Sequence, residues 1–129
     1  MAHRRLIPTI AVVILIAGAF TARHFKPREA EPQWTPGLPR VLELGGVACR
    51  ECALLAPVIT ELKVELQGKV DVRNINALKY PEVFDKYHIR FIPLLIFYDA
   101  QGKELYRREG AWSKAEILAK MQELGMLRR

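Results

Sequence analysis

The sequence predicts an α/β domain with a mixed central sheet of about four strands and helices on both faces, preceded by an N-terminal membrane anchor or signal segment. Two observations predict this class. Short apolar stretches alternate with segments of helical periodicity in the order β-α-β-α-β-β-α. A helix joins the first two strands, as a parallel crossover requires, whereas a tight turn joins the last two and makes them antiparallel.

Residues 1–28 differ in composition from the domain that follows. Residues 1–5 are a short basic start, and residues 6–22 are uncharged and almost wholly apolar. A spanning helix needs about 20 apolar residues, with a range near 17–25, so an uncleaved signal anchor is favoured. The run Ala17-Gly18-Ala19 resembles a cleavage site, so a cleaved signal peptide and secretion to the periplasm stay open. Both alternatives predict an extracytoplasmic domain, on the periplasmic or cell-surface side.

Residues 29–39 predict a linker, and residues 40–129 predict the folded domain. The linker is rich in proline and shows no apolar periodicity. The net charge of +6 is concentrated in residues 1–29, and the rest of the chain is nearly balanced. Since no basic stripe with interleaved aromatic residues is present, nucleic acid is not an expected partner.

The first half of the domain predicts a strand, a long helix and a second strand. Residues 40–44 (RVLEL) predict the first strand. Residues 49–67 carry apolar side chains at helical spacing, with Pro57 expected to kink the helix and Gly68 to end it. Residues 70–75 (VDVRNI) predict the second strand.

The second half predicts a short helix, a hairpin and a last helix. Residues 81–87 (PEVFDKY) predict a helix with proline near its start. The apolar strand 94–98 (LLIFY) is joined by the turn 99–102 to its partner strand 104–109. A capping box opens the last helix, which runs to about residue 124. The capping box consists of Ser113 and Glu116.

The only two cysteines, Cys49 and Cys52, lie in a Cys-Arg-Glu-Cys motif at the predicted start of the long helix. A thiolate at a helix N-terminus is stabilised by the macrodipole and by unpaired N–H groups, which makes it nucleophilic at neutral pH. The second cysteine can close a disulfide, which gives a two-electron redox switch. Alternatives are half of a zinc site or two buried apolar cysteines. No metal is expected, because a second Cys-x-x-Cys is absent and His3, His24 and His88 are scattered.

Three further motifs agree with one protein family. Pro57 lies five residues after Cys52, where that family kinks its active-site helix. Residues 86–93 (KYHIRFIP) resemble its K-Y-G-I-R-G-I-P, and residues 110–114 (GAWSK) resemble its G-A-x-S-K. Together with the Cys-x-x-Cys after the first strand, these motifs make residues 40–124 resemble thioredoxin, and the resemblance implies the thioredoxin fold.

The resemblance also implies roles for individual residues. Cys49 is expected to be the nucleophile and Cys52 the resolving thiol, with no cofactor beyond their redox-active disulfide. Pro93 is expected to be cis and to place the Ile92 backbone against the cysteines, where an extended substrate chain can pair with it. The residues expected to contact substrate are Ala48, Arg50, Glu51, Ile92 and Gly110.

Glu43 lies six residues before Cys49, at the position of the family's buried acid. A carboxyl group desolvated under the site can exchange a proton with Cys52, which is the role that the resemblance implies. Strand alternation places Glu43 on the opposite face from Leu42 and Leu44, and a solvated outward-facing glutamate is the alternative.

The chain departs from the family pattern in several places. Ala48 replaces the tryptophan before the first cysteine, which leaves the surface beside the nucleophile smaller and more open. Arg50 can stabilise a Cys49 thiolate, whereas Glu51 opposes it. The family's buried lysine corresponds to a position near Val72, with Arg73 adjacent, and the sequence leaves that partner of the acid open.

The expected function is a membrane-tethered thiol–disulfide oxidoreductase that reduces disulfides in extracytoplasmic proteins. Its partners would be cysteine-containing protein substrates and a transmembrane thiol electron donor, as in the anchored thioredoxin-like proteins that include those of cytochrome c biogenesis. Two alternatives stay open. The protein can run in the opposite direction as an oxidase or isomerase of secreted proteins, or the fold can serve as a metal-binding or docking module.

Overall fold

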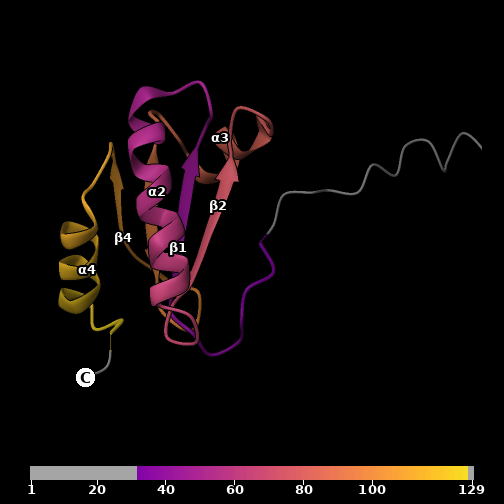
Figure 1. Ribbon diagram of the computed structural model, residues 1–129. Coiled ribbons are helices and arrows are strands. Elements are labelled where there is room, and N and C mark those ends of the chain that lie inside the picture. The colour runs from indigo at the N-terminus through magenta and orange to yellow at the C-terminus, as the bar shows by residue number, and fades with distance from the viewer. Residues whose placement is uncertain (1–31, 128–129) are drawn as a thin grey trace, which may run out of the picture.

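The computed structural model describes residues 32–127 (Figure 1). Its elements are β1 Arg40–Gly45, α2 Arg50–Glu65, β2 Asp71–Asn76, α3 Glu82–Tyr87, β3 Leu94–Tyr98, β4 Glu104–Glu109 and α4 Lys114–Glu123. This order confirms the predicted one. The predicted anchor or signal segment, residues 6–22, lies outside the described residues. Within residues 32–127, no helix combines the length and apolar character that crossing a membrane requires.

The sheet is mixed, as predicted, with β1 in its interior. The strand order is β2-β1-β3-β4. β1 pairs in parallel with β2 and antiparallel with β3, and β4 is antiparallel to β3. The register places Glu43 of β1 between Asn74 of β2 and Leu95 of β3. Because directly paired residues on neighbouring strands point to the same face, these three residues share one face of the sheet.

Helices cover both faces of the sheet, with α2 and α4 on one face and α3 on the other (Figure 1). Side chains alternate along β1. Val41 packs under α2 and α4, whereas Leu42 and Leu44 pack toward α3. Glu43 therefore lies on the opposite face from Leu42 and Leu44, as alternation predicted, and this face is the one that α2 covers. The hydrophobic core between the sheet and the helices α2 and α4 includes five helix residues, which are Leu55, Ile59, Leu62, Ile117 and Met121. Each fully buried side chain of this kind contributes about 1.5–3 kcal/mol to stability.

Local backbone geometry sets where the helices begin. Cys49 is extended (φ −106°, ψ 123°) and is the N-cap of α2, so the helix proper begins one residue later than predicted. Pro57 lies inside α2, as predicted. The predicted capping box of α4 is present. Glu116 N donates to Ser113 Oγ at 3.3 Å, and Ser113 N donates to Glu116 Oε2 at 2.8 Å.

The described part of the predicted linker, residues 32–39, is attached to the domain. Thr35 N donates a 2.7 Å hydrogen bond to Asp71 Oδ2 at the start of β2. The rings of Trp34 and Tyr98 lie 6.4 Å apart between centroids, in a tilted arrangement that aromatic pairs favour. These contacts fix the path by which the chain enters β1.

Candidate active site

Cys49 and Cys52 lie at the junction between β1 and α2 and form a disulfide. Figure 1 shows this junction at the upper end of α2. As N-cap, Cys49 accepts a hydrogen bond through Sγ from Cys52 N at 3.2 Å. Cys49 is partly exposed, whereas Cys52 is only 5% exposed. The helix N-terminus thus favours negative charge on the more accessible sulfur, which suits a nucleophile and a shielded partner.

The loop before β3 supplies the second wall of the site. The Ile92–Pro93 peptide bond is cis, as the resemblance implied, and Pro93 is buried. Ile92 O lies 3.7 Å from Cys49 Sγ. Gly110 N donates a 2.8 Å hydrogen bond to Pro93 O, which ties this loop to the end of β4. The predicted residues Ile92, Pro93 and Gly110 are therefore brought together beside Cys49.

The dipeptide between the cysteines is exposed, as is Ala48. Glu51 reaches toward Gly110, because its Oε2 lies 3.7 Å from the point where a Cβ on Gly110 would stand. Gly110 has a φ of 92°, a left-handed backbone conformation that glycine adopts without strain. Glu51 and Gly110 thus border the same side of the site. The small side chain of Ala48 leaves Cys49 with little cover from the residue before it.

Glu43 is buried beneath the disulfide, with 8% of its surface exposed. A Cβ on Gly45 would overlap Glu43 Oε1 and would lie 3.4 Å from Cys52 Sγ. The carboxyl group and the resolving sulfur therefore border the same small space. Burial raises the pKa of Glu43 from 4.5 to about 7, against a smaller lowering effect of Lys63. A carboxyl with this pKa can accept or donate a proton near neutral pH.

The residues near Val72, where the resemblance places the family's lysine, lie on both faces of the sheet. Val72 pairs with Val41, and Arg73 pairs with Leu42 and bonds Asp71 at 2.6 Å. The β2 residue beside Glu43 is Asn74. Val72 and Asn74 therefore lie on the face of the sheet that carries Glu43, whereas Arg73 lies on the other face.

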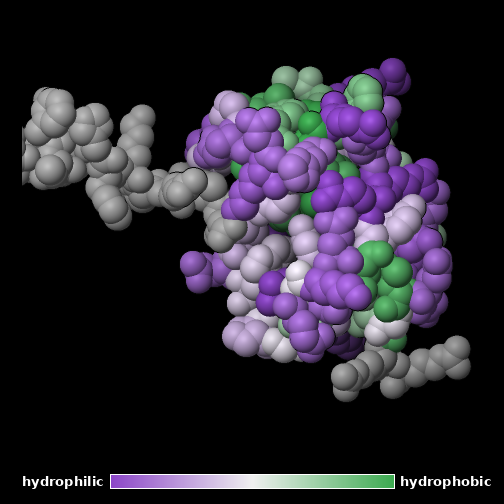
Figure 2. All heavy atoms as spheres, turned by 180° about the vertical axis from the view of Figure 1, so that it is seen from behind, coloured by the Kyte–Doolittle hydropathy of each residue, from purple (hydrophilic) through white to green (hydrophobic). Residues whose placement is uncertain are grey.

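Three exposed apolar side chains near the site were missed by the sequence analysis. Val47, Leu78 and Phe91 are 89%, 47% and 68% exposed. They come from the loops after β1, after β2 and before β3, and a Cβ on Gly46 would collide with the Leu78 side chain. Hydrophobic surface is visible at this upper end of the molecule (Figure 2). Their positions close to the recognised motifs in the sequence could have indicated that these apolar residues border the site.

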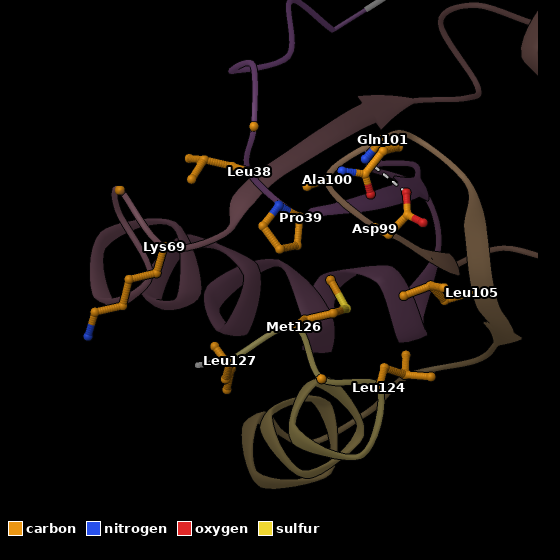
Figure 3. Close-up of a pocket in the computed structure, with 13 residues that line it drawn as sticks. Leu38, Pro39, Lys69, Asp99, Ala100, Gln101, Leu105, Leu124, Met126 and Leu127 are labelled. Carbon is orange, nitrogen blue, oxygen red and sulfur yellow. Dashed lines mark hydrogen bonds between the residues drawn. The ribbon is translucent and has the colours of Figure 1, made fainter. Parts of the chain in front are cut away.

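A separate pocket lies at the opposite end of the sheet. Its volume is about 490 Å³, and it is bordered by the chain entering β1, the β3–β4 turn and the end of α4 (Figure 3). Pro39, Asp99, Leu105 and Met126 are among its lining residues. No predicted site residue lines it. Within residues 32–127, no three His, Cys, Asp or Glu side chains are grouped as metal ligands.

A disulfide at the start of the helix that follows the central strand, beside a cis-proline loop, defines a thiol–disulfide oxidoreductase. Comparison with known proteins agrees. The family model for thioredoxin matches residues 39–123. The chain therefore belongs to the thioredoxin family.

Individual relatives span most or part of the same domain. A thioredoxin-like protein of Synechocystis sp. is 26% identical over 84 residues, which cover 65% of this chain and 79% of the relative. Thioredoxin of Rickettsia conorii is 35% identical over 81 residues, covering 63% of this chain and 76% of the relative. The chloroplastic M-type thioredoxin of Spinacia oleracea is 36% identical over 61 residues, covering 47% of this chain and 34% of the relative.

Proposed function

We propose that this protein is a membrane-tethered reductase of disulfides in extracytoplasmic proteins. The observation that carries the proposal is the asymmetry of the cysteine pair. Cys49 is partly exposed at a helix N-terminus beside Ile92 O, whereas Cys52 is buried near the Glu43 carboxyl. This arrangement suits attack by Cys49 on a protein disulfide, followed by resolution by Cys52.

The reaction begins with the reduced protein. The Cys49 thiolate attacks one sulfur of the substrate disulfide, forms a mixed disulfide and releases the other substrate sulfur as a thiolate, which takes up a proton. The Cys52 thiol gives its proton to Glu43 and attacks Cys49 Sγ, which releases the second substrate sulfur as a thiolate that is protonated in turn. Two electrons have then passed from the Cys49–Cys52 pair to the substrate, which leaves as a dithiol while the protein holds a disulfide.

The surface around Cys49 supports a protein substrate. An extended segment can pass beside Ile92, whose backbone lies against Cys49, and the small side chain of Ala48 leaves room for it. Val47, Leu78 and Phe91 offer exposed apolar contacts next to the nucleophile. Apolar surface of this kind gains stability when a partner covers it, so a polypeptide is a better substrate than a small disulfide.

Tethering and electron supply are part of the same proposal. The apolar segment 6–22 would hold the protein in the membrane, and the domain would work on the extracytoplasmic side. A transmembrane thiol donor would reduce the Cys49–Cys52 disulfide after each turnover. Apocytochrome c whose haem-binding cysteines have formed a disulfide is one substrate class consistent with this arrangement.

The direction of electron flow is tested by the reduction potential of the full chain, measured by equilibration in defined thiol–disulfide buffers. A potential near or below about −270 mV supports the reductase. A potential between about −120 and −180 mV contradicts it and favours the oxidase or isomerase. Absence of any intramolecular disulfide after oxidation would leave only a binding or docking role.

The location is tested separately by fractionation of cells that express the full chain. The proposal expects the protein in the membrane fraction after alkaline washing, with the domain accessible to protease added from the extracytoplasmic side. Recovery in the soluble extracytoplasmic fraction would instead indicate a cleaved signal peptide.

A further inference from the structure

Lys63 of α2 bonds the side chain of the residue that lies beside the buried acid in the sheet. Lys63 lies in the last turn of α2, and its Nζ donates a short hydrogen bond to Asn74 Oδ1. Asn74 is the β2 residue that pairs with Glu43, and both point to the α2 face. The ammonium group is thereby held on the β2 side of Glu43, away from the Cys49–Cys52 disulfide.

Among the described residues, the other groups placed around Glu43 by β2, β3 and α2 are uncharged. Leu95 faces it from β3 and Asn74 from β2, while Cys52 approaches it from α2 across Gly45. Arg73 belongs to the opposite face, since it pairs with Leu42 in the sheet. Within residues 32–127, Lys63 is the charged group that acts on Glu43, and it favours the carboxylate.

We propose that Lys63 is a positioning residue for proton transfer, whose ammonium, held beside Glu43 by Asn74, sets the pH at which Glu43 takes the proton from the Cys52 thiol. This inference rests on the proposed resolving step. In that step the S–H proton of Cys52 passes to the Glu43 carboxylate, and the new thiolate attacks Cys49 Sγ. A nearby positive charge keeps Glu43 ionised, and hence able to accept the proton, to lower pH.

A basic residue in the last turn of a helix also stabilises the helix dipole, and Lys63 can do this without any effect on Glu43. The two roles have different consequences. A dipole role changes the unfolding free energy alone, whereas the proposed role moves the titration of one carboxyl group. The proposed effect also weakens with salt, because Lys63 is exposed to solvent.

The experiment is a pH titration of the Glu43 carboxyl carbon by NMR in the oxidised full chain. It compares the wild type with Lys63→Met, Lys63→Arg and the control Lys69→Met, an exposed lysine just beyond α2. Lys63→Met is expected to raise the pKa of Glu43 by roughly 0.2–0.7 unit, the range for an exposed charge pair. Lys63→Arg restores the wild-type value, Lys69→Met leaves it unchanged, and high salt reduces the difference. An unaltered Glu43 titration in Lys63→Met overturns the proposal.

A second experiment measures the rate of the resolving step as a function of pH. The pH profile of mixed-disulfide resolution in Lys63→Met should shift upward by the same amount as the titration, with Lys63→Arg again matching the wild type. A change in thermal stability without a shift in the profile would assign Lys63 to the dipole role and overturn the proposal. Because the titration uses the oxidised protein and needs no turnover, its outcome does not depend on the proposed reductase activity.

Discussion

Glu43 and Cys52 approach each other across the space left by the absent side chain of Gly45. A Cβ there would overlap the Glu43 carboxyl and stand 3.4 Å from Cys52 Sγ. The acid comes from the central strand and the sulfur from the first turn of α2, so the packing of helix on sheet decides their separation.

Replacing Gly45 by alanine is expected to force the Glu43 carboxyl out of this space. Overpacking of this kind typically costs about 1–3 kcal/mol and should also slow resolution by Cys52. Chemical denaturation and trapping of the mixed disulfide measure the two effects. The double variant Glu43→Ala/Gly45→Ala should regain most of the lost stability, because the colliding carboxyl is gone. Equal losses in the single and double variants would show that the collision is not with Glu43.

Glu43→Gln should change how stability depends on pH. Burial raises the pKa of Glu43 from 4.5 to about 7, with Lys63 acting weakly in the other direction, so the folded chain keeps a proton that the unfolded chain releases. The stability from this group is complete below the unfolded pKa and is lost as pH rises toward 7. The loss is about 3 kcal/mol by about pH 8. Urea unfolding of the oxidised protein across this range should show the slope in the wild type and not in Glu43→Gln.

The two cysteines should give opposite results in a trapping experiment. In Cys52→Ser the exposed nucleophile remains and the resolving thiol is absent, so a mixed disulfide with substrate should accumulate at Cys49. Cys49→Ser should accumulate almost none, because Cys52 is only 5% exposed. Non-reducing gels of the two variants with an oxidised protein substrate give the comparison. Equal trapping by both variants would argue against the assigned roles.

Phe91→Ala should weaken the use of protein substrates while sparing small disulfides. The side chain is 68% exposed, so the loss is expected in substrate contact rather than in folding. Loss of about 1 kcal/mol of apolar contact raises KM roughly fivefold. The matched control is Val64→Ala, which shortens an apolar side chain of similar exposure (74%) at the far end of α2. A parallel loss toward a small disulfide would mean that Phe91 supports the cysteines themselves.

Asp71→Ala should release residues 32–39 from the domain. Burial tends to raise the pKa of Asp71, but hydrogen bonds from Arg73 and Thr35 outweigh it and lower the pKa overall. This stabilisation is present above the unfolded pKa and is lost as pH falls through the folded value. Limited proteolysis should therefore cut the segment faster in Asp71→Ala, and in the wild type on acidification. Asp85→Ala, at an exposed aspartate on α3, is the control.

The fold was predictable because its signals are local. Alternating apolar residues, the turn before β4 and the Ser113–Glu116 capping box each fix an element within a few neighbours, and the connections dictate parallel or antiparallel pairing. The burial of Glu43 could be predicted from the sequence only in part. Alternation gave its face, but its depth depends on α2 packing over Gly45, which no local pattern encodes.

The remaining features of the site depend on register and on contacts between distant segments. Glu43 of β1 pairs with Asn74 of β2, and Lys63 at the end of α2 bonds the same asparagine. These contacts link three elements that are separate in the sequence. A one-residue change in register would have placed a different side chain there. The exposed side chains of Val47, Leu78 and Phe91 are likewise ordinary apolar residues in the sequence, and only the fold brings their loops to one end.

Those three apolar residues also bear on how the protein can diversify. Each stands on a different loop, and none belongs to either buried core. Loop positions of this kind accept substitution with little effect on folding, whereas the sheet and α2 hold the cysteines in place. Relatives can therefore acquire new substrate preferences one loop at a time while the redox chemistry is inherited unchanged.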